Sequence, residues 1–177
     1  MRKWFRPLFL GNATLVFVTV LGSSLLFAQS QASQHAAVLV PDSTVEHAQD
    51  MGVRAHTNHL IRLQAKPTPD ASSPSGQTPS SIRLVYKLPS TGGSQTIAIV
   101  DAFDYPTAEN DLNVFSTQFG LPACTTANGC FKKVYANGSK PKANCGWGQE
   151  AALDIEWAHA MAPSAKIVLV EAATNSF

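Results

Sequence analysis

The stretch TIAIVD occupies residues 96–101, and a second stretch, KIVLVE, occupies residues 166–171. Both contain a continuous run of apolar, mostly β-branched residues that has the length of a strand and ends in an acidic residue. Continuous apolarity predicts strands that are buried on both faces, as in a parallel sheet. A shorter run, FKKVY at residues 131–135, predicts a third strand.

Two helices are expected between these strands. The first covers residues 108–119, where apolar side chains recur at helical spacing until Gly120. Asp104 or Thr107 can supply its N-cap. The second helix covers about residues 148–161. The order strand, helix, strand, helix, strand predicts an α/β fold, in which right-handed crossovers join the strands of an open parallel sheet.

Length and composition limit the number of domains and the kinds of partner. The chain has 177 residues, and 14% of them are charged, so at most one ordinary domain is expected. A formal net charge of +1 excludes a strongly basic nucleic-acid binder, and no nucleic-acid partner is expected. The composition and net charge of the whole chain are averages over three segments of different character, residues 1–32, 33–77 and 78–177.

The first segment has the layout of a secretory signal peptide. Arg2, Lys3 and Arg6 precede an apolar run at 8–27, and small residues suitable for cleavage follow at 28–32. We expect cleavage and a secreted or periplasmic protein, which keeps 10 basic and 12 acidic residues and so a net charge of −2. An uncleaved N-terminal membrane anchor is the alternative, because the run is long enough to span a bilayer. Contact with a membrane is expected only through this segment.

The second segment, residues 33–77, is expected to be a short pro-segment followed by a linker. His56 and His59 could share a helix face and bind a metal ion, but no cluster of acidic or thiol ligands flanks them. We therefore favour a partly exposed pro-segment or an edge element packed on the following domain. Prolines that alternate with Ser, Thr and Gly at 67–80 predict an extended linker. Thr78 then marks the start of a short helix.

The cysteines fit an exported protein. Cys124 and Cys130 enclose a short loop, Thr-Thr-Ala-Asn-Gly, and can form a local disulfide in an oxidising compartment. Cys145 is left over. A zinc site would need more ligands at tighter spacing, so no metal site is expected.

The third segment, residues 78–177, carries two groups of acidic residues. Asp101 and Glu171 follow their strands, and ligands of open α/β sheets bind beyond the carboxyl ends of the strands, so we expect both residues at a cleft. Glu150 and Asp154 are four residues apart on one helix face, between aromatic and aliphatic residues and without a Lys or Arg in the helix. Crowding and partial burial are expected to raise one pKa of this pair, as an acid–base catalyst requires.

The third segment resembles the sedolisins, or serine-carboxyl peptidases. GQEAALDIEWAHAMAPSAKI at residues 148–167 is similar to their catalytic helix, TIAIVDA at 96–102 to their first core strand, and residues 113–120 to the helix behind it. The most specific element is Glu-x-x-Leu-Asp followed by Ala-x-Ala-Pro and an apolar strand. The resemblance extends over about residues 78–177.

This resemblance implies a subtilisin-like fold and a secreted endopeptidase that hydrolyses peptides and proteins in acid. It implies that Glu150 is the general base for a serine nucleophile, and that Asp154 holds Glu150 in place and shares its proton. A carboxylate suits this work because an imidazole is protonated in acid and cannot accept a proton. His159, nine residues after Glu150, lies on another helix face and is expected to be structural.

The resemblance also implies that part of the machinery is missing. In the family, a Gly-Thr-Ser turn with the nucleophile, an oxyanion-stabilising Asp and a calcium site lie further along the chain, and none of them occurs before Phe177. Ser176 is expected to be a loop residue. We therefore expect a truncated peptidase domain, a fragment that is inactive alone and holds no cofactor.

Two other functions are weighed against the peptidase. A non-catalytic secreted α/β module, with a binding or structural role, is the main alternative. A nucleotide-binding half-domain is disfavoured, because AFDYP at residues 102–106 stands where a G-x-G-x-x-G turn would follow the first strand.

Overall fold

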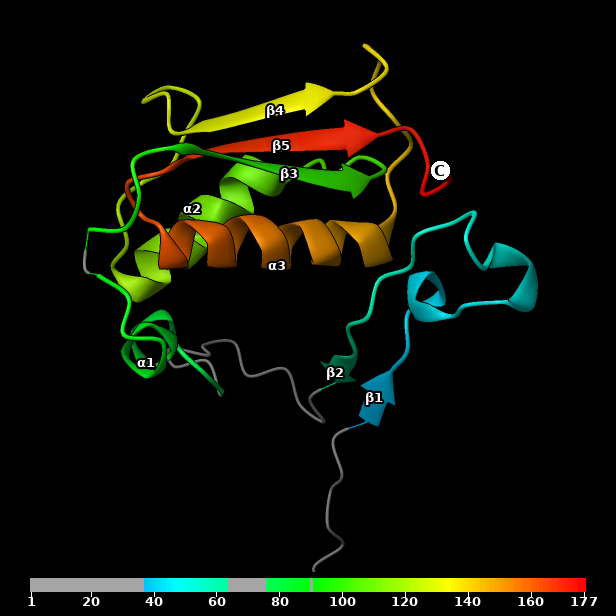
Figure 1. Ribbon diagram of the computed structural model, residues 1–177, viewed down its shortest axis with the longest axis horizontal. Coiled ribbons are helices and arrows are strands. Elements are labelled where there is room, and N and C mark those ends of the chain that lie inside the picture. Colours follow the sequence, from blue (N-terminus) through cyan, green and yellow to red (C-terminus); the bar gives the residue numbers. More distant parts are fainter. Residues whose placement is uncertain (1–36, 64–75, 90) are drawn as a thin grey trace, which may run out of the picture. The chain divides into compact units, whose positions relative to one another are not determined.

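The computed structural model describes residues 37–63, 76–89 and 91–177. The predicted signal peptide, His35 and most of the Pro-rich linker lie outside these residues. Within the described ranges, no helix is long and apolar enough to cross a membrane. The elements, in chain order, are β1 (Ala37–Leu39), two 3-10 turns (Asp42–Thr44 and Ala48–Asp50), β2 (Ile61–Leu63), α1 (Pro79–Val85), β3 (Thr96–Ala102), α2 (Ala108–Phe119), β4 (Phe131–Tyr135), α3 (Cys145–Met161) and β5 (Lys166–Ala172) (Figure 1).

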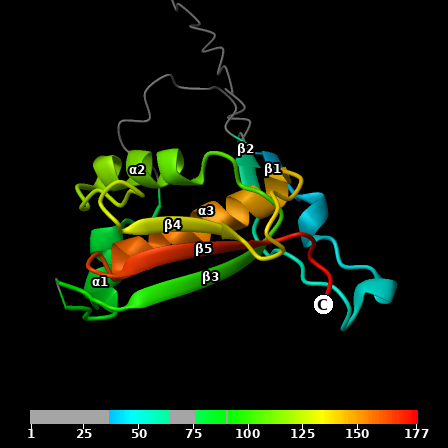
Figure 2. The ribbon, with the colours of Figure 1, turned by 90° about the horizontal axis from the view of Figure 1, so that it is seen from above.

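Three strands form a parallel sheet in the order β3-β5-β4 (Figure 2). The last strand in the chain is therefore the central one, and Ile167 pairs with Ile97 of β3 and with Phe131 of β4. This arrangement confirms the predicted α/β class and the parallel sheet. The short runs around Val38 and Ile61, whose structure the sequence left open, form a separate antiparallel pair, β1 and β2.

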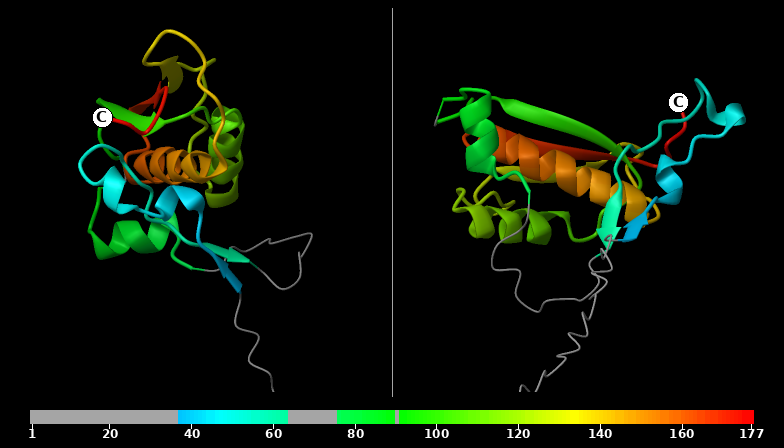
Figure 3. Two further views of the ribbon diagram at one scale, coloured as in Figure 1. Left: turned by 90° about the vertical axis from the view of Figure 1, so that its right-hand side faces the viewer. Right: turned by 90° about the horizontal axis from the view of Figure 1, so that it is seen from below.

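Both long helices lie on the same face of the sheet, which we call the inner face (Figures 1 and 3). Odd-numbered residues of the three strands point to this face, and Ile167 and Leu169 of β5 are fully buried there. They pack with residues of both helices and of the loop before β4 in one core cluster: Ala108, Leu112, Cys124, Phe131, Ala151, Ile155, Ile167 and Leu169.

The expectation that residues 96–101 are buried on both faces is wrong. Thr96, Ala98 and Val100 are exposed, and Val100 is 68% exposed. They lie on the outer face of β3, which no described helix covers (Figure 3). The prediction failed because a continuous apolar run shows only that both faces of a strand are apolar. It does not show whether a helix is present to cover each face.

Helix α3 begins at Cys145, three residues before the predicted start. Asn144 caps it, because its side-chain oxygen accepts a hydrogen bond of 3.1 Å from the backbone N–H of Trp147. The bounds of α2 agree with the prediction, and Gly120 ends it in the left-handed region at φ 65°. Thr107 is at the N-cap position of α2, but its side chain makes no capping hydrogen bond.

The short helix α1 starts at Pro79 with Thr78 as its N-cap, as predicted. The Thr78 hydroxyl accepts a hydrogen bond of 3.2 Å from the backbone N–H of Ser81. Arg83 then fastens α1 to the end of α3, since its guanidinium donates a hydrogen bond of 2.9 Å to the carbonyl of Ala160.

Replacing Ile155 by Ala should test how α3 holds the sheet. Ile155 is fully buried in the core cluster, so the substitution is expected to lower the free energy of unfolding by about 2–5 kcal/mol. Leu153→Ala on the same helix is the matched control, because Leu153 is 44% exposed and its loss is expected to matter far less. Urea unfolding followed by circular dichroism measures both, and equal losses would contradict the assigned inner face.

Candidate active site

Glu150 and Asp154 lie on one face of α3, as their spacing predicts. The Glu150 side chain is 19% exposed, and Asp154 is half-buried. Burial, followed by the charge of Glu150, raises the pKa of Asp154. One carboxyl group of the pair, that of Asp154, therefore keeps its proton to a higher pH than usual, as expected from the sequence.

Asp101 joins this pair from the sheet. It is the sixth residue of β3, on the inner face, and is only 4% exposed. Burial raises its pKa to about 7, and the charges of Asp154, Glu150 and Glu171 add to the effect. Its Oδ2 atom is buried without a hydrogen-bond partner. The expected cleft residue is thus a buried strand residue beside the helix pair, and the three carboxyl groups compete for protons.

Glu171 belongs to a different cluster, although it pairs in register with Asp101. Its Oε1 atom accepts a hydrogen bond of 2.8 Å from the backbone N–H of Tyr105 and lies 3.4 Å from Lys133 Nζ. Burial raises its pKa, and its contact with Asp104 acts in the same direction. Glu171 is 1% exposed, so it is a buried structural carboxyl group and not a residue of an open cleft.

Asp104 is the anionic centre of that second cluster. Lys133 Nζ lies 3.0 Å from its Oδ1 atom and Lys140 Nζ lies 3.3 Å from its Oδ2 atom. Burial alone would raise the pKa of Asp104, but the hydrogen bond from Lys133, together with the neighbouring Glu171 and Lys140 side chains, outweighs burial and lowers it. The sequence offered Asp104 as a helix cap and missed this role. The available signal was Lys133, a charged residue two positions after Phe131 and therefore on the same inner face of β4.

A histidine from the predicted pro-segment contacts the candidate base. His59 Nδ1 lies 2.9 Å from Glu150 Oε2, and its Nε2 lies 3.1 Å from Gln149 Oε1. Because a carboxylate only accepts hydrogen bonds, Nδ1 is the donor to Glu150. His56 lies elsewhere, 3.6 Å from the carboxylate of Asp50. The two histidines are therefore not on one helix face, and no pattern in the sequence predicted the contact of His59 with Glu150.

The turn Asp42–Thr44 holds this histidine in place. The Ser43 and Thr57 hydroxyls are 2.8 Å apart, and the Thr44 hydroxyl donates a hydrogen bond of 3.2 Å to the carbonyl of His59. Ser43 in turn packs against Gly146 in the first turn of α3, where a Cβ would overlap its hydroxyl. A cavity of about 680 Å³ adjoins the same end of α3, between this segment and Tyr105.

The three carboxyl groups can accept and share protons. Among the described residues they supply only the base of a nucleophilic site, without a nucleophile beside it. No hydroxyl of the described residues is hydrogen-bonded to Glu150; His59 occupies that carboxylate. Ser176 lies in the loop after β5, where its backbone forms a bridge with Arg54. Cys124 and Cys130 form a disulfide, and Cys145 is free and exposed.

Comparison of the chain with protein-family models, with curated proteins and with solved structures gives no match. The functional argument therefore depends on the residues of α3, β3 and the segment before them.

Replacing Gly146 by Ala is expected to release residues 42–59 from α3. The added Cβ would overlap Ser43, whereas alanine itself favours a helix over glycine by roughly 0.5–1 kcal/mol. Hydrogen exchange with mass spectrometry should show faster exchange in residues 42–59 and unchanged protection in β5. Gly148→Ala is the matched control, because its Cβ would only touch a neighbouring ring. Unchanged exchange in Gly146→Ala would contradict the docking contact.

The stability of the fold is expected to fall as the pH rises from about 4 to about 7. The folded state keeps a proton on Asp101, whose pKa is raised from 3.8 to about 7, whereas the unfolded chain releases it in this range. Glu156, whose pKa burial and then Asp111 raise to about 7, contributes in the same direction.

Asp101→Asn tests this assignment by urea unfolding across the same pH range. The amide cannot ionise, so the variant is expected to lose less stability than the original chain between pH 4 and pH 7, and Asp101→Asn with Glu156→Gln should flatten the dependence further. An unchanged slope in the double variant would contradict the raised pKa values.

Proposed function

We propose that this chain carries the base half of a sedolisin-type serine-carboxyl peptidase site. The observation that supports it is the convergence of three carboxyl groups: Glu150 and Asp154 of α3 with Asp101 of β3, where mutual charge and burial raise the pKa of Asp154 and of Asp101. The proposed family activity is endopeptidase hydrolysis of peptide bonds in acid, and the substrates are peptides and proteins.

In this proposal Glu150 takes the proton of a serine hydroxyl as the serine attacks the peptide carbonyl. The Glu150 side chain is 19% exposed, whereas Asp101 is 4% exposed, and one Glu150 carboxylate oxygen contacts His59. Asp154, one turn further along α3, holds a proton in acid because of its raised pKa, and a protonated carboxyl can donate to Glu150 and orient it. Asp101 lies behind the pair and discourages a second negative charge there.

The segment before the domain fits an inhibitory role. His59 occupies the Glu150 oxygen that would accept the serine proton. Three contacts further back hold the segment against the chain end: Ala55 N–H to Asn175 O, Asn175 Nδ2 to Ala55 O and Phe177 N–H to Val53 O. We therefore propose that residues 37–63 act as a pro-segment, whose displacement frees Glu150 for catalysis.

Export is part of the same proposal. A cleaved signal peptide at residues 1–32 would deliver the chain to a secreted or periplasmic location. The Cys124–Cys130 disulfide is suited to such an oxidising compartment.

A non-catalytic secreted module is the second candidate, and one observation favours it. The outer face of β3 is largely apolar and exposed, with Val100 68% exposed. An exposed apolar surface is more typical of a binding interface than of a monomer without partners. In that case Glu150 and Asp154 would be replaceable without functional loss.

The purified 177-residue chain is expected to hydrolyse no fluorogenic peptide at acidic pH. The Gly-Thr-Ser turn of the family is not among its residues, and a triad without its nucleophile retains little catalysis. Turnover by this chain that Glu150→Gln abolishes would contradict the expected inactivity.

A longer product that carries a Gly-Thr-Ser turn after residue 177 in the same reading frame should cleave peptides in acid. Glu150→Gln in that product is expected to lower kcat/KM by about 1,000-fold or more. Glu46→Gln, an exposed carboxylate in the pro-segment, is the matched control and should retain activity. Full activity in Glu150→Gln would exclude Glu150 as the base and would favour the non-catalytic module.

A further inference from the structure

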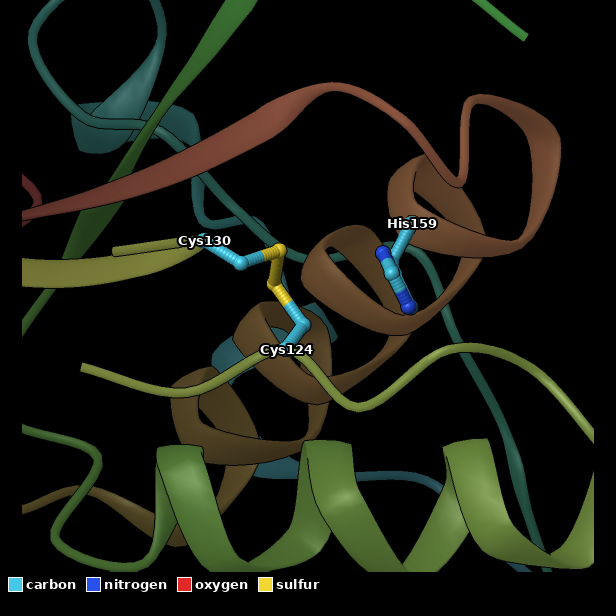
Figure 4. A group of neighbouring side chains, drawn as sticks. All are labelled: Cys124, Cys130 and His159. Carbon is cyan, nitrogen blue, oxygen red and sulfur yellow. A yellow bond between two sulfur atoms is a disulfide. The ribbon is translucent and has the colours of Figure 1, made fainter. Parts of the chain in front are cut away.

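A buried histidine faces the disulfide at the far end of α3 from Glu150. One imidazole nitrogen of His159 and the sulfur atoms of Cys124 and Cys130 all lie within 4.8 Å of one another (Figure 4). Cys124 and His159 are fully buried, and Cys130 is half-buried. Cys124 and Cys130 lie in the loop between α2 and β4, and His159 lies near the end of α3, so the fold brings the histidine to the two cysteines.

His159 is oriented as a metal-ligating histidine would be. Its Nε2 lies 2.8 Å from the carbonyl oxygen of Pro122, which can only accept, so the ring proton sits on Nε2. Nδ1 therefore presents a lone pair, and it is buried with no hydrogen-bond partner. Metal-bound histidines typically donate their second ring N–H to a backbone carbonyl, which fixes the tautomer and the ring orientation.

We propose that Cys124, Cys130 and His159 form a zinc site when the disulfide is reduced. A dithiol reductant breaks the S–S bond and is itself oxidised to a disulfide, and its two protons pass to the cysteine sulfurs. Zn²⁺ then replaces these two thiol protons, which are released to solvent, and binds two thiolates and Nδ1 of His159. Zinc does not change its oxidation state in this step.

The charges and the geometry favour Zn²⁺ over other ions. Burying a net charge would be unfavourable. Two thiolates neutralise the double charge of Zn²⁺, so the proposed site buries no net charge. Ligand atoms on a tetrahedral zinc lie about 3.4–3.8 Å apart. The two sulfur atoms must therefore separate from bonding distance after reduction, whereas the histidine nitrogen, within 4.8 Å of both, needs only a small movement. Cys130 is half-buried, so we expect solvent to supply the fourth ligand from its side, as in other sites with two cysteines and one histidine.

Titration of the full exported chain with Co²⁺, a coloured substitute for Zn²⁺, tests the proposal. Cys145→Ser serves as the background in every sample, because the exposed Cys145 could bind metal itself. After anaerobic reduction with a phosphine, one equivalent of Co²⁺ is expected to produce the intense visible bands of a tetrahedral thiolate site, and Zn²⁺ should displace it. The oxidised chain, which has the same histidines, is the matched control and should stay colourless.

His159→Gln separates a built site from chance binding. The Gln amide can still donate to Pro122 O but supplies no Nδ1 lone pair, so metal affinity of the reduced chain is expected to fall about 10–100-fold. Circular dichroism of the oxidised variant checks that it folds. If the reduced chain were merely unfolded, other histidines would replace His159 and affinity would not change. That result, or equal binding by oxidised and reduced chains, would overturn the proposal.

Discussion

The packing of α3 against the inner face of the sheet is the constraint on which the rest of the structure depends. Ile155 and Ala151 of α3 meet Ile167 and Leu169 of β5 in the core cluster, and this contact sets the rotation of the helix. With that rotation set, Glu150 and Asp154 face Asp101, and His159 faces the disulfide. One apolar contact therefore positions two chemically different groups at opposite ends of a single helix.

The inner face is apolar at the amino ends of the strands and charged at their carboxyl ends. Asp101 and Glu171 pair in register there, and Lys133, which pairs with Leu169 one inner-face position further back, reaches Glu171 with its side chain. Burial of these groups is tolerated in two ways. Asp104 and Glu171 are compensated by Lys133. Asp101 forms no ion pair with the residues that the structure describes and keeps its proton instead, because burial and its acidic neighbours raise its pKa to about 7. The uncompensated group is the one that lies beside the candidate catalytic pair.

The segment before the domain depends on the first turn of α3 in a similar way. Gly146 leaves room for Ser43, Ser43 meets the Thr57 hydroxyl, and the backbone after Thr57 delivers His59 to Glu150. These contacts are short and polar, and they depend on the absence of a side chain at Gly146. They bury little apolar surface. Such a segment is held less firmly than the core, which suits the proposed pro-segment, whose displacement would free Glu150.

Local patterns in the sequence determined most of the secondary structure. Thr78 and Pro79 set the start of α1, Gly120 the end of α2, and the β-branched runs the positions of β3 and β5. The spacing of Glu150 and Asp154 placed them on one helix face, because a helix turns once in about 3.6 residues. These are short-range effects, and the chain near each residue is enough to decide them.

Only the tertiary structure decided which distant residues meet. Local sequence did not decide the exposure of the outer face of β3 or the partners of Lys133. It also did not decide the contact of His59 with Glu150 or the approach of His159 to a disulfide 29 or more residues away in the chain. Each of these depends on which layers cover the sheet and on how α3 is rotated over it. The sequence by itself therefore determined the elements and the carboxylate pair, whereas long-range packing determined the partners of each group and thus its chemistry.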